Sequence, residues 1–550
     1  MTKVLLLFAL LLSISLQLYC VNHMDLIFMM QGTTAYGDFG AGLAALDFNG
    51  DGFDDLAVLQ RGWAPDSLIT NPPTVMYGRI LIYYGGPNFD SVPDFIIEGT
   101  YSWQFCPSQY SCYLVNLGDV NGDGYDDLSA RGYTNYSDIL ADSHKPYVAA
   151  YFGGQNPSTQ PGYYKSFPSP HSGGYAEIDP LGDINNDGFD DFSYTYHANS
   201  SYNELSRTDF ILGDSMTEVV WRQYNGNDGG IISMHPSGDV NNDGFDDYTA
   251  TYTSILGPGN YTYSNTLYYG SSFVQPADSL VLYSGQNINV YRTNYLGDLN
   301  GDGKDDFCGR IYYPNAYIWY GNENLTSQFN LILNPAWSGN NSDGRGLIYG
   351  DLNNDGYDDV IGSMPISHGE NGGFRIWLGG ASMNGTSDLE IAGTHSGMLL
   401  GTGMAAGDFN GDGLCDIAAS APHSSTFDST PGRVYVYAGN AQLADTTVDI
   451  QDNTIIKTQD NWSFKVVPNP MYGKQNWKLK LTGKGFDRYR DMTVIIYNLK
   501  GQRVKAIHIS SSQLKTGEIS LSNLNLPAGV YEISLYDKGN LLKTRKATIK

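Results

Sequence analysis

A ten-residue string that begins with aspartate returns seven times, and it constrains the fold more than any other feature. The copies begin at Asp47, Asp119, Asp183, Asp239, Asp298, Asp351 and Asp408, and they read DFNGDGFDDL, DVNGDGYDDL, DINNDGFDDF, DVNNDGFDDY, DLNGDGKDDF, DLNNDGYDDV and DFNGDGLCDI. Successive copies start 72, 64, 56, 59, 53 and 57 residues apart. A period of about 60 residues with variable insertions predicts one supersecondary unit repeated seven times.

Five positions of the string never change. Positions 1, 5 and 9 are Asp, position 3 is Asn and position 6 is Gly in all seven copies. Three carboxylates and an amide oxygen, with the backbone carbonyl of position 7 and water, supply the six or seven oxygen ligands that calcium takes. Glycine at position 6 suits the sharp turn that such a loop needs. One copy alone would fit a solvated turn equally well, but seven copies with the same fixed positions favour metal binding.

The sequence therefore predicts about seven Ca²⁺ ions, one in each loop. The expected ligands are Asp47, Asn49, Asp51, Phe53, Asp55, Asp119, Asn121, Asp123, Tyr125, Asp127, Asp183, Asn185, Asp187, Phe189, Asp191, Asp239, Asn241, Asp243, Phe245, Asp247, Asp298, Asn300, Asp302, Lys304, Asp306, Asp351, Asn353, Asp355, Tyr357, Asp359, Asp408, Asn410, Asp412, Leu414 and Asp416. Position 7 contributes only its carbonyl, so Lys304 does not break the fifth copy. Position 8, which is Asp in six copies and Cys415 in the last, is expected outside the ligand set, where it adds negative field or orients backbone amides.

The loop is not an EF-hand, because an EF-hand requires a bidentate glutamate at position 12. The residues at that position are Val58, Ala130, Tyr194, Ala250, Gly309, Gly362 and Ala419. Positions 2 and 10 are apolar or aromatic in every copy, from Phe48 and Leu56 to Phe409 and Ile417. We therefore expect a nine-residue loop between two buried β-strands.

A second signature follows each loop and completes a four-stranded unit. Strands ended by glycine are predicted at 78–86, 147–154, 209–214, 266–272, 316–322, 374–380 and 432–440, and a further strand follows, as in PDFIIEGT at 93–100. Four-stranded units repeated seven times predict an all-β fold, a seven-bladed β-propeller at residues 21–450. The segment from Met24 to Gln31 resembles a strand displaced from the last blade, and pairing there would close the ring without a free edge.

These two signatures resemble the FG-GAP repeats of integrin α-subunit propellers over roughly residues 23–450. The likeness is strongest at FGAGLAALDFNGDGFDDLAV and at GMAAGDFNGDGLCDIAASAP with GRVYVYAG. The resemblance implies a seven-bladed propeller with calcium in the loop between the first two strands of a blade. Integrin subunits carry the metal loop in only some blades, whereas all seven blades carry it here, so metal is expected to stabilise the ring.

Both ends of the chain point to export. Lys3 followed by an apolar run from Val4 to about Leu16 predicts a signal peptide at residues 1–20. A lipid-modified Cys20 is the less favoured alternative, because Tyr19 stands where a small residue is needed. Cys106 and Cys112 could form a local disulfide or remain as thiols. No other run is apolar enough to span a membrane.

The last 90 residues are expected to form a separate domain, which follows a linker at 451–461. Residues 461–550 hold 16 of the 31 Lys and Arg and 5 of the 58 Asp and Glu, which leaves the preceding chain with a net charge of −38. A body that acidic disfavours nucleic acid and anionic membranes as partners. Alternation at Val494, Ile496, Val504, Val530, Ile533 and Leu535 predicts a small antiparallel β-sandwich at 462–550.

This tail resembles the C-terminal sorting domain of the type IX secretion system. The resemblance rests on PNP at 468–470, IYNLKGQRVK at 496–505, LPAGVY at 526–531 and the final basic strand. It implies a Gram-negative bacterium, passage through the outer membrane by the type IX machinery, and removal of the tail with surface attachment or release. The expected location is therefore the cell surface or the medium.

The sequence favours a calcium-stabilised, non-catalytic module that binds glycans or proteins. Loops before the metal strands are rich in aromatic residues, namely Tyr36, Tyr110, Tyr163, Tyr224, Tyr291 and the three candidate ligand contacts Trp103, Tyr164 and Trp337. For any single one of these residues, packing between blades is the alternative. A calcium-dependent polysaccharide lyase or hydrolase is the alternative, although no Ser-His-Asp or paired-Glu arrangement is visible. A purely structural surface spacer is the third possibility.

Overall fold

The structure is a computed structural model of the whole chain. It describes residues 24–33, 37–65, 76–101, 104–105, 114–134, 145–167, 175–197, 205–225, 229–257, 260–272, 278–286, 291–310, 315–334, 346–365, 371–394, 397–422, 431–443, 462–467, 477–483, 491–497, 503–510, 518–521, 526, 529–537 and 540–549. The chain divides into two compact units, Met1–Val448 and Asp449–Lys550. The described residues of both units form only β-strands as regular elements, apart from the four-residue α2 (Gly213–Met216) in the first unit.

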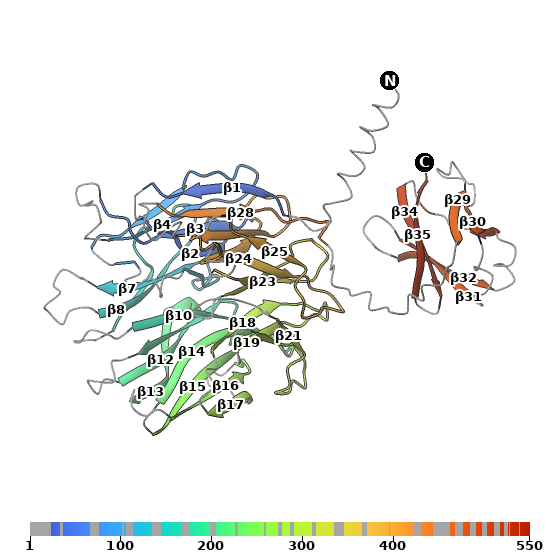
Figure 1. Cartoon of the computed structure of the whole chain (residues 1–550). Helices are drawn as coiled ribbons and strands as arrows, with labels where there is room; N and C mark the ends of the chain where they lie inside the picture. The colour runs from blue at the N-terminus through green and yellow to red at the C-terminus, as the bar shows by residue number, and fades with distance from the viewer. Residues whose placement is uncertain are drawn as a thin grey trace. The chain divides into compact units, whose positions relative to one another are not determined.

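The described part of the first unit contains seven antiparallel sheets of four strands each (Figure 1). In sheets 1 to 3 the strands are β2 (Phe39–Leu46), β3 (Asp55–Gln60), β4 (Arg79–Tyr83) and β5 (Phe95–Glu98); β6 (Val115–Asn116), β7 (Leu128–Thr134), β8 (Lys145–Tyr151) and β9 (Tyr163–Ser166); and β10 (Tyr175–Gly182), β11 (Asp191–His197), β12 (Leu205–Leu212) and β13 (Thr217–Asn225). In sheets 4 and 5 they are β14 (Gly229–Gly238), β15 (Asp247–Gly257), β16 (Asn260–Tyr268) and β17 (Ser279–Gln286); and β18 (Tyr291–Gly297), β19 (Asp306–Arg310), β20 (Ala316–Trp319) and β21 (Leu331–Leu333). In sheets 6 and 7 they are β22 (Leu347–Gly350), β23 (Asp359–Ser363), β24 (Gly373–Trp377) and β25 (Leu389–Ala392); and β26 (Met404–Gly407), β27 (Asp416–Ala421), β28 (Arg433–Tyr437) and β1 (Leu26–Gln31).

The first strands of the seven sheets contact one another in a closed cycle. β2 contacts β6, contacts continue in order through β10, β14, β18 and β22 to β26, and β26 contacts β2. Each sheet is therefore a blade, and the arrangement is that of a β-propeller. The predicted closing strand is confirmed, because β1 pairs antiparallel with β28 and the two lie side by side in Figure 1.

The hydrophobic core of this unit lies in layers between adjacent blades. Seven clusters of buried side chains are present, and each draws its residues from two neighbouring sheets, for example Phe210 of blade 3 with Tyr248 of blade 4. Positions 2 and 10 of all seven loops belong to this buried set, as predicted. Their burial fixes the strands that enter and leave each loop, so the loops are held in equivalent places around the ring.

The second unit is a small β-sandwich. One sheet contains β29 (Trp462–Val467), β30 (Trp477–Gly483) and β33 (Glu518–Leu521), and the other contains β32 (Arg503–Ser510), β31 (Asp491–Tyr497), β34 (Gly529–Asp537) and β35 (Asn540–Ile549). Both sheets contribute to one buried cluster, which includes Phe464 and Val494. Val504 is 37% exposed, so the alternation predicted for its strand is wrong at that residue.

Candidate metal-binding loops

Each loop turns through two residues with left-handed backbone conformation. The glycine at position 6 has φ between +82° and +90° in all seven copies, as its predicted role requires. Position 4 is also left-handed in every copy, with φ from +54° to +74°, and is always Gly or Asn. Sequence reasoning missed position 4, although its restriction to the two residue types that best tolerate this conformation was a usable signal.

The carboxylates at positions 1 and 5 hold the turn from inside. In the first loop, Asp47 accepts hydrogen bonds from the backbone N–H groups of Gly50 (2.8 Å) and Gly52 (2.9 Å). The bond from position 6 to position 1 recurs in all seven copies at 2.8 to 2.9 Å. Position 5 accepts the N–H of position 7 in every copy, at 3.0 to 3.2 Å. The seven loops therefore share one geometry.

The aspartate at position 9 lies beneath the loop and is fully buried in every copy. Asp55 accepts hydrogen bonds from Phe48 N–H in the loop (3.0 Å) and from Gly85 N–H at the end of the third strand (2.8 Å). The bond from the strand-ending glycine recurs in all seven blades at 2.7 to 2.9 Å. This contact explains why the two sequence signatures occur together, since a Cβ on Gly85 would lie 2.2 Å from the carbonyl oxygen of Asp54.

Burial raises the pKa values of the position-9 carboxyls well above the usual range of an aspartate side chain. For Asp55 the pKa rises to about 8, because burial outweighs the hydrogen bond from Gly85 and the negative charges of Asp51 and Asp47 add to it. The value is about 8 at Asp127, Asp247, Asp306 and Asp359 and about 7 at Asp191 and Asp416. Three acidic groups thus oppose one another in each loop, and a bound cation would relieve that repulsion.

The donor set fits a hard cation, but its side chains do not yet surround a common centre. Among the described residues, no group of three or more His, Cys, Asp or Glu side chains is placed to hold a metal. The carboxylates are turned onto backbone N–H groups, and the Asn49 amide nitrogen donates to Asp51 at 3.1 Å. Metal binding would therefore require these side chains to turn inward, and oxygens at positions 1, 3, 5, 7 and 9 would then be the ligands.

Position 8 joins each loop to the loop of the preceding blade. Asp190 accepts the backbone N–H of Asp119 at 2.8 Å, and its own N–H donates to the carbonyl of Asp119 at 3.2 Å. The side-chain bond recurs at six of the seven junctions at 2.8 to 3.0 Å, including the one that closes the ring, from Asp408 to Asp54. The expected orienting role is therefore observed, and the oriented amide belongs to another blade.

The seventh junction lacks this bond. Cys415 N–H donates to the Asp351 carbonyl at 3.3 Å, but no hydrogen bond from Asp351 N–H to the Cys415 side chain is found among the described residues. A space constraint accompanies six of the seven junctions, this one included, since an added Cβ would lie 2.0 Å from Asp190 at Gly118 and 2.5 Å from Cys415 Sγ at Gly350. The backbone bond from position 8 to the position-1 carbonyl is found at six junctions of the described chain, this one included, but not at the closing junction between Asp54 and Asp408, whereas the side-chain bond is missing only here.

The comparisons with known proteins agree with this geometry. Residues 298–362 match the FG-GAP-like repeat family and residues 400–437 match the FG-GAP repeat family. The chain carries FG-GAP repeats. Residues 465–550 of this FG-GAP repeat protein match the secretion system C-terminal sorting domain, which indicates export to the cell surface or secretion by the type IX system. No described helix is long and apolar enough to cross a membrane.

Curated relatives include integrin α subunits. Integrin alpha-8 of Mus musculus is 30% identical over 102 residues, which is 18% of this chain and 9% of that protein. Integrin alpha-PS2 of Drosophila melanogaster is 34% identical over 114 residues, 20% of this chain and 7% of that protein. The FG-GAP repeat protein therefore spans less than a tenth of the length of these relatives. Among solved structures, a chain in the crystal structure of BBS1N in complex with ARL6DN, soaked with lead, aligns with this chain at 8% identity and a TM-score of 0.38. The alignment covers 76% of this chain and 96% of that one.

The predicted ligand contacts are only partly visible. The structure does not describe six of the residues singled out from the sequence, namely Trp103, Trp337, Tyr36, Tyr110, Cys106 and Cys112. The side chains of Tyr224 and Tyr291 also lie outside the described part. Tyr164 is 46% exposed and stacks on Tyr147, with ring centroids 5.2 Å apart. Tyr163 is buried between blades 2 and 3, so for this aromatic residue the alternative of packing between blades holds.

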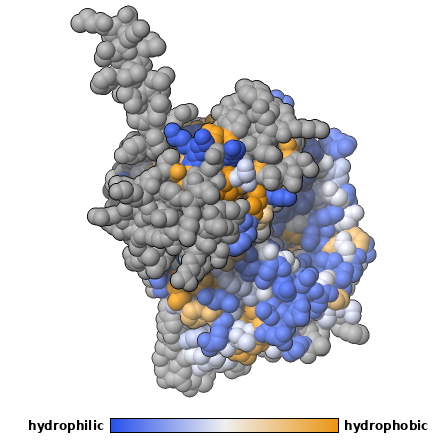
Figure 2. Space-filling model, turned by 90° about the vertical axis from the view of Figure 1, so that its right-hand side faces the viewer, coloured by the Kyte–Doolittle hydropathy of each residue, from blue (hydrophilic) through white to orange (hydrophobic). Residues whose placement is uncertain are grey.

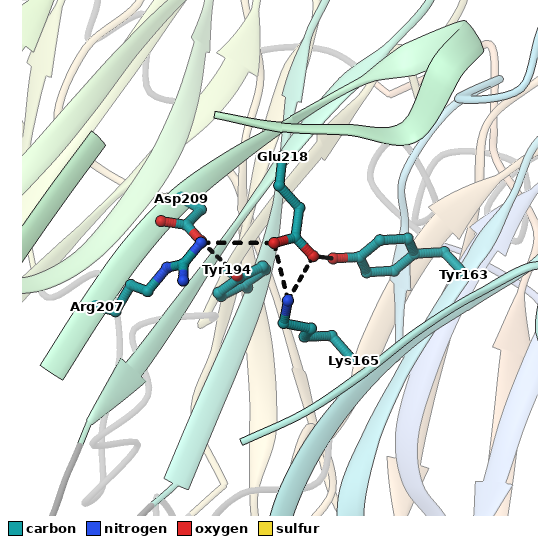
Figure 3. A network of polar contacts seen from close by, with 6 residues as sticks. All are labelled: Tyr163, Lys165, Tyr194, Arg207, Asp209 and Glu218. Carbon is teal, nitrogen blue, oxygen red and sulfur yellow. Dashed lines mark hydrogen bonds and ion pairs between the residues drawn. The ribbon is translucent and has the colours of Figure 1, made fainter. Parts of the chain in front are cut away.

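Tyr163 instead enters a polar network that joins the outer edges of blades 2 and 3 (Figure 3). Glu218 of β13 accepts from Lys165 of β9 at 2.7 and 2.8 Å and from the Tyr163 hydroxyl at 3.3 Å. Arg207 pairs with Glu218 at 3.5 Å and also with the buried Asp209, which accepts from the Tyr194 hydroxyl. These contacts link edge strands of neighbouring blades, which assigns the network to blade packing.

Proposed function

We propose that this FG-GAP repeat protein is an exported, non-catalytic binding module whose propeller is stabilised by calcium in its seven loops. The observation that carries the proposal is the shared loop geometry, in which a buried position-9 carboxyl opposes the carboxylates at positions 1 and 5. FG-GAP repeats and integrin similarity support a binding or adhesion role. The sorting domain supports an extracellular setting, where calcium is abundant and can complete folding.

The calcium content is tested on the full chain after EDTA treatment and exchange into metal-free buffer. Calorimetric titration should give about seven ions, and a loop variant with Asp183→Asn and Asp187→Asn should bind about one ion fewer. Asp90→Asn removes a charge outside the loops and is the matched control, because Asp90 only caps a turn by accepting Val92 N–H. An unchanged stoichiometry in the loop variant would contradict the assignment.

The proposed ligands are glycans or proteins recognised through aromatic side chains. Tyr164 supports this choice because its ring is exposed and is held by stacking on Tyr147. The described surface on the face in Figure 2 is largely hydrophilic, with hydrophobic residues in small patches, which suits recognition by a few placed rings.

The ligand assay incubates the calcium-loaded chain with a panel of polysaccharides and scores both retention and newly formed sugar ends. Retention without cleavage supports the binding module. New ends abolished by EDTA would instead identify a calcium-dependent lyase or hydrolase. Trp103→Ala, Tyr164→Ala and Trp337→Ala test the contacts, and Tyr175→Ala is the control at another exposed ring, 44% exposed. Full retention by all three variants would refute these residues as glycan contacts.

A further inference from the structure

The first strands of all seven blades line a cavity of about 500 Å³ that no loop ligand enters. This volume falls within the range of small-molecule sites in proteins. Its lining is a ring of equivalent positions, because every blade contributes the residue four places before the first aspartate of its loop. The cavity therefore has one side chain per blade at this level, and their chemistry defines what it can hold.

The ring at this level is divided into a polar arc and an apolar arc. Blades 3, 4 and 5 contribute Asp179, His235 and Asn294, while blades 6, 7, 1 and 2 contribute Leu347, Met404, Leu43 and Val115. His235 Nδ1 lies 3.6 Å from Asp179 Oδ1, and both side chains are buried. One wall can thus exchange hydrogen bonds and the opposite wall can cover hydrocarbon.

The polar arc offers acceptors for a ligand that donates. The Asn294 amide nitrogen donates to the Leu347 carbonyl at 3.4 Å, and its Oδ1 atom has no hydrogen-bond partner among the described residues. Asp54 and Asp179 place two carboxyl groups in the lining, and His235 is the only basic side chain among the lining residues. At the loop end, the lining residue Asn116 donates to Asp126 at 2.8 Å, and Tyr295 donates to Asp305 at 3.1 Å. The surroundings are therefore acidic and rich in acceptors.

From this arrangement we propose that the cavity lined by the seven first strands, called the axial cavity below, binds a small organic ammonium ion with an apolar body. The ammonium group donates to Asp179 and to Asn294 Oδ1, and the hydrocarbon part lies against Leu43, Leu347 and Met404. Neither a carboxylate nor a phosphate ligand suits the site, because no Lys or Arg lines it. The proposed contacts, Asp179 and Asn294, are neither calcium ligands nor exposed aromatic residues, although Asp54 at position 8 of the first loop also lines the cavity, so the proposal stands or falls independently of the function proposed above.

The test titrates the full, calcium-loaded chain with 2-phenylethylamine and, as a neutral probe of the same shape, 2-phenylethanol. Calorimetry or ligand-observed NMR should show that the amine binds at least ten times more tightly than the alcohol. Asp179→Asn removes the carboxylate that accepts from the ammonium group, so it should weaken amine binding about ten-fold or more, which corresponds to about 1.4 kcal/mol or more. Asp90→Asn makes the same change of charge outside the cavity and should leave binding unchanged.

Asn294→Leu provides a second variant if Asp179→Asn does not fold. It removes the unpaired acceptor without changing charge, and it should also weaken amine binding while calcium stoichiometry stays the same. Absence of amine binding by the folded chain, equal binding of amine and alcohol, or binding unaffected by both cavity variants would overturn the proposal. Displacement of the amine by a lysine-rich peptide would assign the site to a protein side chain instead of a free amine, which also refutes a small-molecule ligand.

Discussion

The junction bonds at position 8 make a prediction for individual backbone amides. Asp246 accepts the N–H of Asp183 at 2.8 Å, whereas no side-chain acceptor for the Asp351 N–H is found among the described residues, because Cys415 replaces the aspartate there. A hydrogen bond to a charged group contributes about 1.5–3 kcal/mol. Since about 1.4 kcal/mol is a factor of ten, losing it should accelerate local exchange of the Asp183 amide roughly 10- to 100-fold.

The assay is hydrogen exchange of the calcium-loaded chain, resolved to peptides that begin each loop. In the unmodified chain the Asp351 amide should exchange fastest of the seven position-1 amides. Asp246→Ala should bring the Asp183 amide to a similar rate and leave the other junctions unchanged, while Asp246→Asn, which keeps an oxygen acceptor, should retain most of the protection. Equal protection of Asp351 and the other six amides would refute the reasoning, as would unchanged exchange at Asp183 in the alanine variant.

The global effect of the same change should be small. Unfolding entropy is about 2.1 cal/mol/K per residue, so a unit that ends at Val448 requires roughly 1 kcal/mol for each degree of Tm shift. Asp246→Ala alone should therefore lower Tm by about 1–3 °C. Combining it with Asp54→Ala and Asp358→Ala, which remove the same bond at two junctions that are not adjacent to it, should lower Tm by about the sum of the three effects.

Three further predictions follow from buried charges and backbone conformation. The position-9 carboxyls have folded-state pKa values of about 7–8, above the unfolded value, so the metal-free chain should lose stability as pH rises from about 4 to 8. A Tm in EDTA that is higher at pH 8 than at pH 5 would contradict this. Saturating calcium should remove the loss, because the metal displaces the protons. Gly303→Ala should cost about 1–2 kcal/mol in a urea titration through its φ of +82° alone, whereas Gly321→Ala should cost more because its Cβ would lie 2.5 Å from the Asp305 carbonyl oxygen. Arg207→Leu should lower the free energy of unfolding by about 3–5 kcal/mol, because it leaves the fully buried Asp209 without its cation. Lys165→Met, which breaks the partly exposed pair with Glu218, should lower it by less than about 1 kcal/mol in the same urea titration.

The all-β fold and the closing strand were predictable because they depend on signals repeated in every blade. Positions 2 and 10 and the strand-ending glycines recur with each loop, so the strand order could be read without three-dimensional information. The pairing of β1 with β28 followed from the same pattern, since Met24 to Gln31 completes a blade that otherwise lacks its fourth strand. Val504 shows the limit of alternation, because Ile507 and Ile509 of the same strand face the core and Val504, three residues before Ile507, falls on the opposite face.

The candidate site was only partly predictable. The residue types at positions 1, 3, 5 and 9 indicate a cation loop, but the sequence does not show that position 9 is fully buried or that a glycine 15 to 30 residues later donates to it. The partner of position 8 lies in another blade, 60 to 79 residues away in five junctions and 354 residues away in the sixth. The polar arc of the axial cavity likewise arises only when Asp179, His235 and Asn294 meet across three blades.

The junction bonds also give a physical reason for keeping the loop in all seven blades. The first aspartate of every loop except the sixth has its backbone N–H fixed by a side chain of the next blade, and its own side chain organises the N–H groups of its turn, as Asp119 does between Asp190 and Gly124. Loss of one loop would therefore loosen the loop of the preceding blade as well as its own. The interruption at Cys415 lies in blade 7, which is also the blade completed by β1 from the start of the chain. Blade 7, whose sheet depends on pairing between the two ends of the propeller, thus meets blade 6 through a loop junction that lacks the side-chain bond, although the two blades share a buried hydrophobic cluster as the other pairs do. The loop junction between blades 6 and 7 is therefore where the ring should open first when calcium is withdrawn.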